Sequence, residues 1–408
     1  MVFTNFVRDL KAQKVRAIVT IVGITWGTFA LLFLLGIGES FSDRSKKGFI
    51  DVYGEDTGTI YTFQTTKAYK GLGKGRPITL REEDITVLRS RIPEIAFISP
   101  IYSLPNVNFQ IPGNKPVRVT VTGVYPEWGT MKNIYSQDVG RFINDNDILY
   151  KSRVVFLDKE LKKDLFGERN AIGNTVNING IPFLIIGTLH EEISSLIAFS
   201  FDESRNSVIP SSTFQSLFGQ SRVGNVLFSP HDSKNMDLII NEIYSVLSQK
   251  YQFDPEDRGA VRILNFNEII TRMLKYLLTL KVFLSFVAAL TLLVGGLGVS
   301  NIMNIVVEER KREIGIKLAV GAKRSIILKE FFFESLFLSG IGGIVGFLIT
   351  SSIFKILSLL KLQDYFGTPK ISLSVFVLAM SILSLIAFFA GFFPARKASR
   401  LNPVEALR

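Results

Sequence analysis

The sequence predicts a membrane protein with four transmembrane helices and a large α+β domain between the first and second helix. Three observations predict this class. Four apolar stretches are each long enough to cross a hydrocarbon core, which takes about 20 residues. Lysines and arginines gather beside these stretches. The segment 39–281, between the first two stretches, has the mixed composition of a water-exposed domain.

The composition suits a chain that is partly embedded in lipid and partly exposed to water. Of the 408 residues, 47% are hydrophobic and 20% are charged, and the net charge is +11. A strongly basic chain can bind nucleic acid, but here the basic residues flank apolar stretches, which is the pattern of membrane topology. No nucleic-acid partner is therefore expected. The chain has no cysteine, which excludes disulfides and thiolate metal sites.

The spans are expected at residues 17–38, 282–307, 335–360 and 371–393. Their apolar stretches, which in the third span end at residue 354, contain no Asp, Glu, Lys, Arg or His. A soluble helix of this length normally shows a polar stripe. The first span is longer than a signal-peptide core and lacks a small-residue cleavage site, so we interpret it as an uncleaved anchor. Transport coupled to protons or ions usually needs ionisable groups in the membrane, so energy for moving cargo is expected to come from outside the bilayer.

Orientation follows from the basic residues, which are enriched on the cytoplasmic side of membrane proteins. They occur in the N-terminal amphipathic segment 1–16, in the connection 308–334 and in the tail 394–408. These segments are expected in the cytoplasm, with both chain termini. The domain 39–281 and the short link 361–370 are then outside.

The spans are rich in glycine at spacings that let helix backbones approach closely. We predict helix packing at Gly23, Gly27, Gly295, Gly296, Gly298, Gly342, Gly343 and Gly346. The pattern leaves open whether this packing is within one chain or between subunits. Because four spans are few for a transporter, we expect a homodimer or heterodimer.

The exterior domain combines strand and helix patterns. Residues 117–122 alternate with period two, and Asn179-Gly180 between two short apolar runs predicts a β-hairpin. A helix is predicted over 80–91, with Thr79 and Glu82 as a capping box, and another over 236–250. The glycine-rich and lysine-rich segment 65–77 is expected to be a mobile loop.

No catalytic or metal-binding pattern is recognisable in this domain. His190 and His231 are far apart in the sequence, and the glycines near residue 73 lack the spacing of a phosphate-binding loop. No nucleotide-hydrolysis motif occurs in the chain, so it is not expected to be an enzyme or to hold a cofactor or metal. The domain is interpreted as a binding or docking module.

The connection between the second and third spans carries the most specific pattern. Residues 308–322 predict a short helix that ends at Gly321, a residue that readily adopts the left-handed conformation. Glu313 and Lys317 are spaced for an i,i+4 ion pair. Ile314 and Leu318 form an apolar strip, which predicts that a partner docks there.

The motifs of this connection resemble those of a known family. Glu309-Arg310-x-x-Glu313-Ile314-Gly315, followed by Ala319-x-Gly321-Ala322, resembles the signature of FtsX/MacB-type permeases. The terminal stretch 393–408 is similar to the family's terminal motif. Short glycine motifs of the exterior domain, from Gly123-Val124 to Ile209-Pro210, follow the order of the family's periplasmic core domain.

The resemblance implies the permease subunit of a MacB-type ABC transporter. A separate cytoplasmic ATPase, which binds ATP and Mg²⁺, would dock on the connection and move the exterior domain without opening a channel. Arg310 and Glu313 would position the loop. The residues implied to contact the ATPase are Ile314, Gly315, Leu318, Ala319, Gly321 and Ala322.

Further partners and the location also follow from the resemblance. It implies the inner membrane, a second permease subunit, a periplasmic adaptor and an outer-membrane duct. The expected activity is export of a drug, peptide or other small molecule from the periplasm. Two alternatives remain open, namely lipoprotein release as in the LolC/LolE permeases and regulation of an envelope enzyme as in FtsX.

Overall fold

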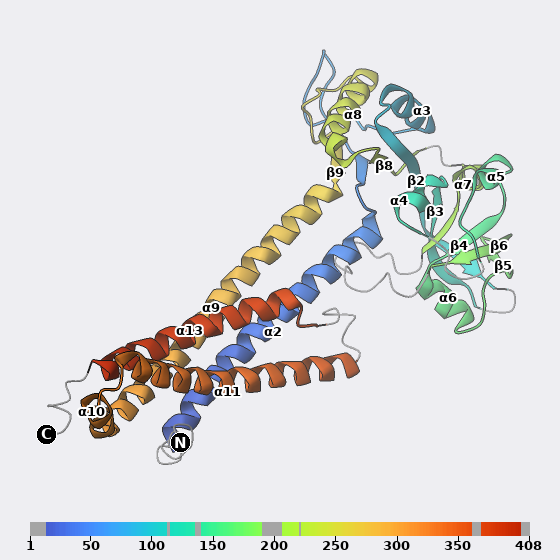
Figure 1. The fold of residues 1–408 in the computed structure, drawn as a ribbon. Helices are drawn as coiled ribbons and strands as arrows, with labels where there is room; N and C mark the ends of the chain where they lie inside the picture. Colours follow the sequence, from blue (N-terminus) through green and yellow to red (C-terminus); the bar gives the residue numbers. More distant parts are fainter. Residues whose placement is uncertain are drawn as a thin grey trace. The chain divides into compact units, whose positions relative to one another are not determined.

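The computed structural model describes residues 14–111, 115–134, 140–189, 206–219, 222–360 and 369–400 (Figure 1). The chain divides into two compact units, a helical unit of Met1–Arg44 with Leu274–Arg408 and an α/β unit of Ser45–Met273. Sequence predictions that fall on residues 1–13, 361–368 and 401–408, and the histidine at position 190, lie outside the described residues.

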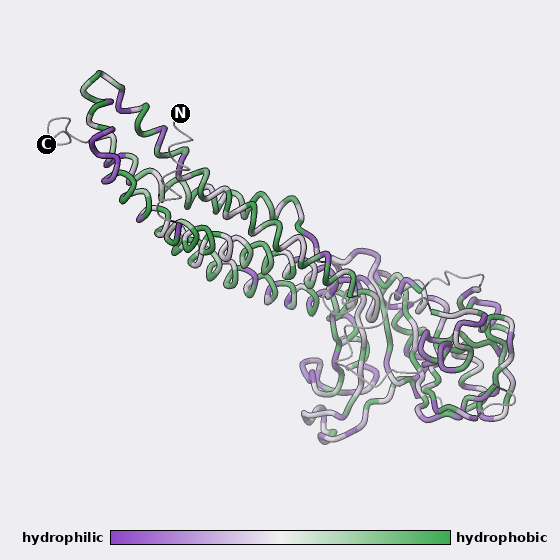
Figure 2. The backbone as a smooth tube through the Cα atoms, turned by 90° about the horizontal axis from the view of Figure 1, so that it is seen from below, coloured by the Kyte–Doolittle hydropathy of each residue, from purple (hydrophilic) through white to green (hydrophobic). Residues whose placement is uncertain are grey.

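The helical unit confirms the predicted fold class. Among the described residues, four helices are long and apolar enough to cross a membrane, and Figure 2 shows them mostly in the colour of hydrophobic residues. They are α2 (Lys14–Tyr53), α9 (Phe266–Glu309), α11 (Arg324–Leu359) and α13 (Leu373–Ser399). Each is longer than its expected apolar stretch. Helices α2 and α9 continue beyond the apolar stretch and carry the chain from one unit into the other.

The core of the helical unit lies where these helices meet. Leu31 from α2, Leu292 from α9 and Leu338 from α11 are completely buried, and Leu383 from α13 packs in the same cluster. The lipid-facing sides of the helices keep large apolar side chains exposed. This distribution is the one expected for helices that contact each other on one side and acyl chains on the other.

The α/β unit is built on one nine-stranded sheet, ordered β3-β7-β4-β6-β5-β2-β8-β1-β9. An additional β2–β3 pairing closes part of the sheet into a barrel of β2, β3, β7, β4, β6 and β5. The strands are β1 (Gly58–Thr62), β2 (Ile95–Gln110), β3 (Val117–Val124), β4 (Val154–Leu157), β5 (Thr175–Ile178), β6 (Ile181–Thr188), β7 (Asn206–Pro210), β8 (Asn225–Pro230) and β9 (Val261–Asn265).

Strand β2 takes part in both halves of this sheet. Residues 95–101 pair with β8 in the antiparallel arm β2-β8-β1-β9, and residues 102–110 pair with β3 and β5 in the barrel. The register shifts between Leu104 and Val107, where Asn106 has a φ of 60°. Such a bulge bends a strand, which lets one strand serve two sheets.

Helices cover both halves of the α/β unit (Figure 1). The arm carries α3 (Glu82–Arg91) and α8 (Met236–Tyr251), whose contacts are with β2, β8 and β9. The shorter helices are α4 (Glu127–Met131), α5 (Asp145–Leu149), α6 (Lys159–Phe166), α7 (Ser211–Phe218) and the 3₁₀ turn η1 (Ser233–Asn235). The two large buried clusters of this unit lie under these helices and inside the barrel.

Local predictions in this unit are confirmed in part. The Asn179-Gly180 hairpin joins β5 and β6, with positive φ at both residues, and α8 covers the predicted helix. Helix α3 begins at Glu82, two residues later than predicted. Its cap is also different, because the Asp84 carboxylate accepts a hydrogen bond from the backbone N–H of Arg81.

The segment 65–77 differs from the expected mobile loop because its backbone is bonded in place. The N–H of Thr65 donates to the carbonyl of Arg76, and Asp257 accepts hydrogen bonds from the N–H groups of Thr66 and Lys67. Asp257 is 1% exposed. Burial would raise the pKa of Asp257, but the hydrogen bonds from Thr66, Lys67 and Gly259 outweigh it and hold that pKa below its ordinary value.

Candidate functional site

The connection between α9 and α11 contains the predicted short helix. Helix α10 (Lys311–Ala319) follows α9 after a single residue, Arg310. It is followed by Gly321, whose φ of +97° lies in the left-handed region. The N–H of Ala322 donates to the carbonyl of Lys317 at 2.9 Å. This is a glycine-terminated helix end, so the prediction of a helix that stops at Gly321 is confirmed.

A buried ion pair ties the start of α10 to α11. Arg310 Nη1 lies 3.0 Å from Glu334 Oε1, and the side chains are only 10% and 6% exposed. A charge-assisted hydrogen bond away from water is strong, and either partner left alone would be a costly buried charge. The pair therefore fixes the junction of α9 and α10 against the beginning of the third apolar span.

A second ion pair ties the end of α10 to the same helix. Lys317 Nζ lies 3.1 Å from Glu330 Oε1 on α11 and 3.5 Å from Glu313 Oε1, one turn earlier on α10. Glu330 is 12% exposed, whereas Glu313 is 49% exposed. The more buried Lys317–Glu330 pair is the one that joins the two helices, and Glu313 adds the i,i+4 support predicted from its spacing.

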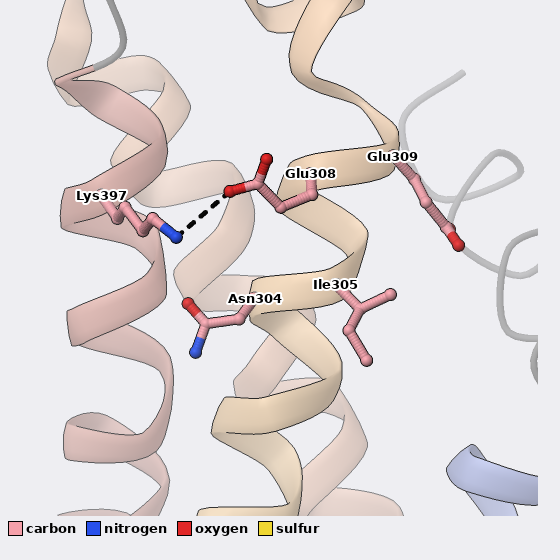
Figure 3. A pocket seen from close by; sticks show the side chains of 5 residues that line it. All are labelled: Asn304, Ile305, Glu308, Glu309 and Lys397. Carbon is pink, nitrogen blue, oxygen red and sulfur yellow. Dashed lines mark hydrogen bonds and ion pairs between the residues drawn. The ribbon is translucent and has the colours of Figure 1, made fainter.

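A third ion pair joins α9 to the end of α13. Lys397 Nζ lies 3.1 Å from Glu308 Oε1, with both side chains more than half exposed. Figure 3 shows this pair together with Asn304, Ile305 and Glu309. These five residues line a shallow depression of about 400 Å³. The three pairs together connect the ends of α9, α10, α11 and α13.

The apolar strip of Ile314 and Leu318, on which a partner was expected to dock, faces the core of the helical unit. Ile314 is 3% exposed, Gly315 is buried, and Leu318 packs against the core of the helical unit. The opposite face carries Ile316, which is 48% exposed, and Val320, which follows the helix and is 84% exposed. Residues four apart share a helix face, so the ion pairs that hold α10 turn one apolar strip inward and the other outward.

The expected contact of Ile314 with an ATPase is therefore corrected, since its side chain belongs to the core. Gly315 is buried with it. Ala319 and Gly321 lie on the exposed side, and Ala322 is half-buried. Ile326, in the first turn of α11, is 56% exposed and extends the outer apolar surface.

The glycines named from the sequence all face helices of the same chain. A side chain added at Gly27 would meet Leu292 on α9 at 2.8 Å, and one added at Gly346 would meet the carbonyl of Thr25 on α2 at 2.8 Å. The contacts of the others are Gly23 with Gly295, Gly295 with Ile24, Gly296 with Ile386, Gly298 with Thr20, Gly342 with Ile24 and Gly343 with Leu383. The α2–α9, α2–α11, α9–α13 and α11–α13 pairs therefore approach within the protomer.

Sequence reasoning gave no role to several residues that hold this site together. Glu330, Glu334 and Lys397 complete the three ion pairs. Gly391 lies so close to Ser335 that any residue with a side chain at this position would hold α11 and α13 apart. A carboxylate at the edge of an apolar span, such as Glu334, is the one signal that would have pointed to a buried partner. In the described part of the chain, no group of three or more His, Asp or Glu side chains is placed to hold a metal ion.

Four apolar helices with an inserted α/β domain and a tethered connecting helix define a multi-pass membrane protein. The family profile of the MacB-like periplasmic core domain matches residues 17–246, and that of the FtsX-like permease C-terminal region matches residues 285–403. The chain therefore belongs to the FtsX-like permeases with a MacB-like periplasmic core domain, and it is a permease of the MacB-type ABC transporters.

Similar proteins occur in different bacteria. The chain is 29% identical to the uncharacterized ABC transporter permease YknZ of Bacillus subtilis, over 97% of this chain and 96% of that protein. It is 30% identical to the macrolide export ATP-binding/permease protein MacB of Wolinella succinogenes, over 98% of this chain. It spans 58–60% of the length of the first MacB relatives.

Among solved structures, the periplasmic region of MacB from Actinobacillus actinomycetemcomitans is similar. The match has 24% sequence identity and a TM-score of 0.43, and it covers 55% of this chain and 95% of that one.

Proposed function

We propose that α10 and the turn after it form the docking point for a separate cytoplasmic ABC ATPase, which binds ATP and Mg²⁺. ATP-driven closure of that partner would then move the permease. In this scheme the chain exports a drug, peptide or other small molecule from the periplasm and has no catalytic activity of its own.

One observation carries this proposal. Helix α10 is held by the Arg310–Glu334 and Lys317–Glu330 ion pairs, yet Ile316, Val320 and Ile326 remain exposed beside it. Apolar side chains gathered at a polar end of a helical unit favour a protein contact, because burying them removes apolar surface from water. A rigidly held apolar surface is also the kind of site through which a partner can apply force.

The ion pairs supply a path for that force. A displacement of α10 would pull on α11 through Glu330 and Glu334, and on α9 through the chain itself. Helices α2 and α9 lead into the α/β unit, so movement of the helical unit would reach that domain along continuous helices. The apolar stretches offer no ionisable residues for a path across the membrane, which favours mechanical transmission over a channel.

The remaining assignments belong to the same proposal. The name of the MacB relatives includes macrolide export, which supports export of small molecules from the periplasmic side. We place the chain in the inner membrane with both termini in the cytoplasm, as a dimer with a second permease subunit. A periplasmic adaptor and an outer-membrane duct would complete the export route.

The docking surface is tested by placing a charge on it. The tagged chain is purified from native membranes, and the ATPase activity recovered with it is measured. With the V320D/I326D variant this activity should be at least tenfold lower, because two carboxylates would face the apolar contact surface of the partner. The matched control is L149D, which alters a leucine of the α/β unit whose exposure of 71% lies between those of Val320 and Ile326, and this variant should retain the ATPase.

Unchanged ATPase recovery with V320D/I326D would contradict the proposal. The I314D variant is unsuitable for this test, because the buried side chain would disturb the core of the helical unit. Cross-linking of the α/β unit in cells distinguishes the three possible functions. Export predicts capture of an adaptor. Capture of a lipoprotein would indicate lipoprotein release, and capture of an envelope hydrolase would indicate regulation of an envelope enzyme.

A further inference from the structure

The two helices that lead into the α/β unit are fastened to each other where they reach its sheet. Helix α2 ends at Tyr53, and α9 begins at Phe266, directly after β9. The rings of these two residues are stacked, with centroids 4.2 Å apart and planes inclined by 20°. Phe266 is 3% exposed. A buried aromatic pair of this kind is held more firmly than its apolar area alone would achieve.

Backbone groups close the same joint. The hydroxyl of Thr57, a completely buried residue, donates to the carbonyl of Tyr53 at 2.6 Å and so caps the end of α2. The carbonyl of Thr57 accepts a hydrogen bond from the N–H of Phe266 at 3.1 Å. Strands β1 and β9 continue from here as an antiparallel pair, with Gly58 opposite Asn265. The joint is therefore continuous with the sheet.

Asp56 links this joint to the arm. One carboxylate oxygen accepts a hydrogen bond from the side-chain amide of Asn267, in the first turn of α9, and the other accepts one from the hydroxyl of Ser233. Ser233 begins η1, which runs directly into α8. Asp56 has a φ of 54°, a conformation that is uncommon for residues other than glycine and that surrounding contacts must maintain. A single carboxylate thus connects α9 and the segment after α2 with α8.

The joint is also seated against α4. Gly54 follows α2 directly, and a side chain added there would collide with the carbonyl oxygen of Met131, the last residue of α4. Helix α4 contacts β2 and β8. Its Glu127 pairs with Arg89 of α3 at 2.9 Å. Contacts from the joint therefore reach two helices of the arm, α8 through Asp56 and α3 through α4.

This arrangement differs from two helices that enter a domain through separate flexible connections. Such connections would absorb the sliding of one helix along the other. Packed and hydrogen-bonded elements instead shift as discrete bodies, so a displacement of either helix must move the arm or break the joint.

We propose that Asp56, together with the Tyr53–Phe266 ring pair, couples α2 and α9 to the arm, so that a movement of either helix is delivered to α8. This inference rests on the proposed function, in which ATP-driven closure of a partner moves the permease. Asp56 is a positioning residue in this scheme. Loss of its two hydrogen bonds should leave the ATPase docked and remove the response of the arm.

The test is hydrogen–deuterium exchange of the full chain, purified from native membranes together with its ATPase and measured by mass spectrometry. The S233A/N267A variant removes both side-chain donors to Asp56 and leaves that residue in place. The first turn of α9, which includes the N–H of Phe266, should exchange about tenfold faster in this variant, because the lost hydrogen bonds stabilise the closed joint.

The matched control is S90A/N174A, which also removes one serine and one asparagine. The hydrogen bonds of these two side chains stay within α3 and within the loop before β5, where their acceptors are carbonyls three or four residues away. This variant should leave exchange in the first turn of α9 unchanged.

A second measurement separates coupling from stability. When ATP and Mg²⁺ are added to the complex, exchange in α8 should change in the unaltered chain and in S90A/N174A. S233A/N267A should keep the recovered ATPase activity and the response of α10, but lose the response of α8. A retained response of α8 in S233A/N267A would overturn the inference alone. Recovery of no ATPase with the unaltered chain, or no response of its α10 to ATP, would instead overturn the proposed function and this inference with it.

Discussion

At the scale of single residues, the Arg310–Glu334 pair makes the most stringent energetic demand. Removing a charge from water costs several kcal/mol, and only a well-placed partner offsets this. With side chains 10% and 6% exposed, each of the two depends on the other. The pair therefore defines the position of α10 rather than adding general stability.

Breaking this pair should be expensive. E334Q leaves the Arg310 charge buried without its carboxylate, so the free energy of unfolding should fall by about 3 kcal/mol or more. The measurement is chemical unfolding of the detergent-solubilised chain. E268Q removes the exposed Glu268–Arg272 pair and should cost less than about 1 kcal/mol.

A double variant separates the two explanations for such a loss. In R310M/E334M both charges are replaced by apolar side chains of similar length, and much of the stability should return. If this variant were no more stable than E334Q, the loss would come from packing, and the ion-pair account would be wrong.

At the scale of elements, glycines decide which helices can touch. Gly346 and Gly340 lie on the same helix, α11, but only one of them faces a neighbour. A side chain added at Gly346 would meet Thr25 and Thr28 of α2 within 3 Å, whereas nothing lies within 4 Å of one added at Gly340.

The two positions should respond oppositely to the same substitution. G346A should destabilise the chain by about 1–3 kcal/mol, because α2 and α11 must move apart. G340A should be neutral or stabilising by up to about 1 kcal/mol, because alanine favours a helix over glycine. Thermal unfolding of both variants in one detergent gives the comparison, and equal midpoints would contradict the packing seen here.

Helix α10 illustrates why an element can be predicted more easily than its orientation. Its C-terminal end is a local property, set by the left-handed Gly321. The sequence has apolar residues on two faces, with Ile314 and Leu318 on one and Ile316 and Val320 on the other. The choice between them is made by Glu330 and Glu334, which lie on a different helix.

At the scale of the whole molecule, the proposed orientation can be tested directly because the natural chain has no cysteine. Single substitutions to cysteine at Leu149, in the α/β unit, and at Val320, beside α10, introduce thiols at positions that are 71% and 84% exposed. A membrane-impermeant maleimide should label L149C in intact spheroplasts, and V320C only after permeabilisation. Labelling of V320C in intact spheroplasts would reverse the topology and remove the ATPase proposal.

Local patterns in the sequence are enough to predict four membrane-crossing helices, the insertion of an α+β domain between the first two, and the short helix ending at Gly321. These follow from apolar runs, period-two alternation and glycine stops, which are properties of neighbouring residues. The three-dimensional fold is needed to see that β2 and β3 close a barrel, that Ile314 faces inward, that Arg310 pairs with Glu334, and which helix each glycine contacts. Each of these depends on segments far apart in the chain coming together, and no local pattern records that pairing.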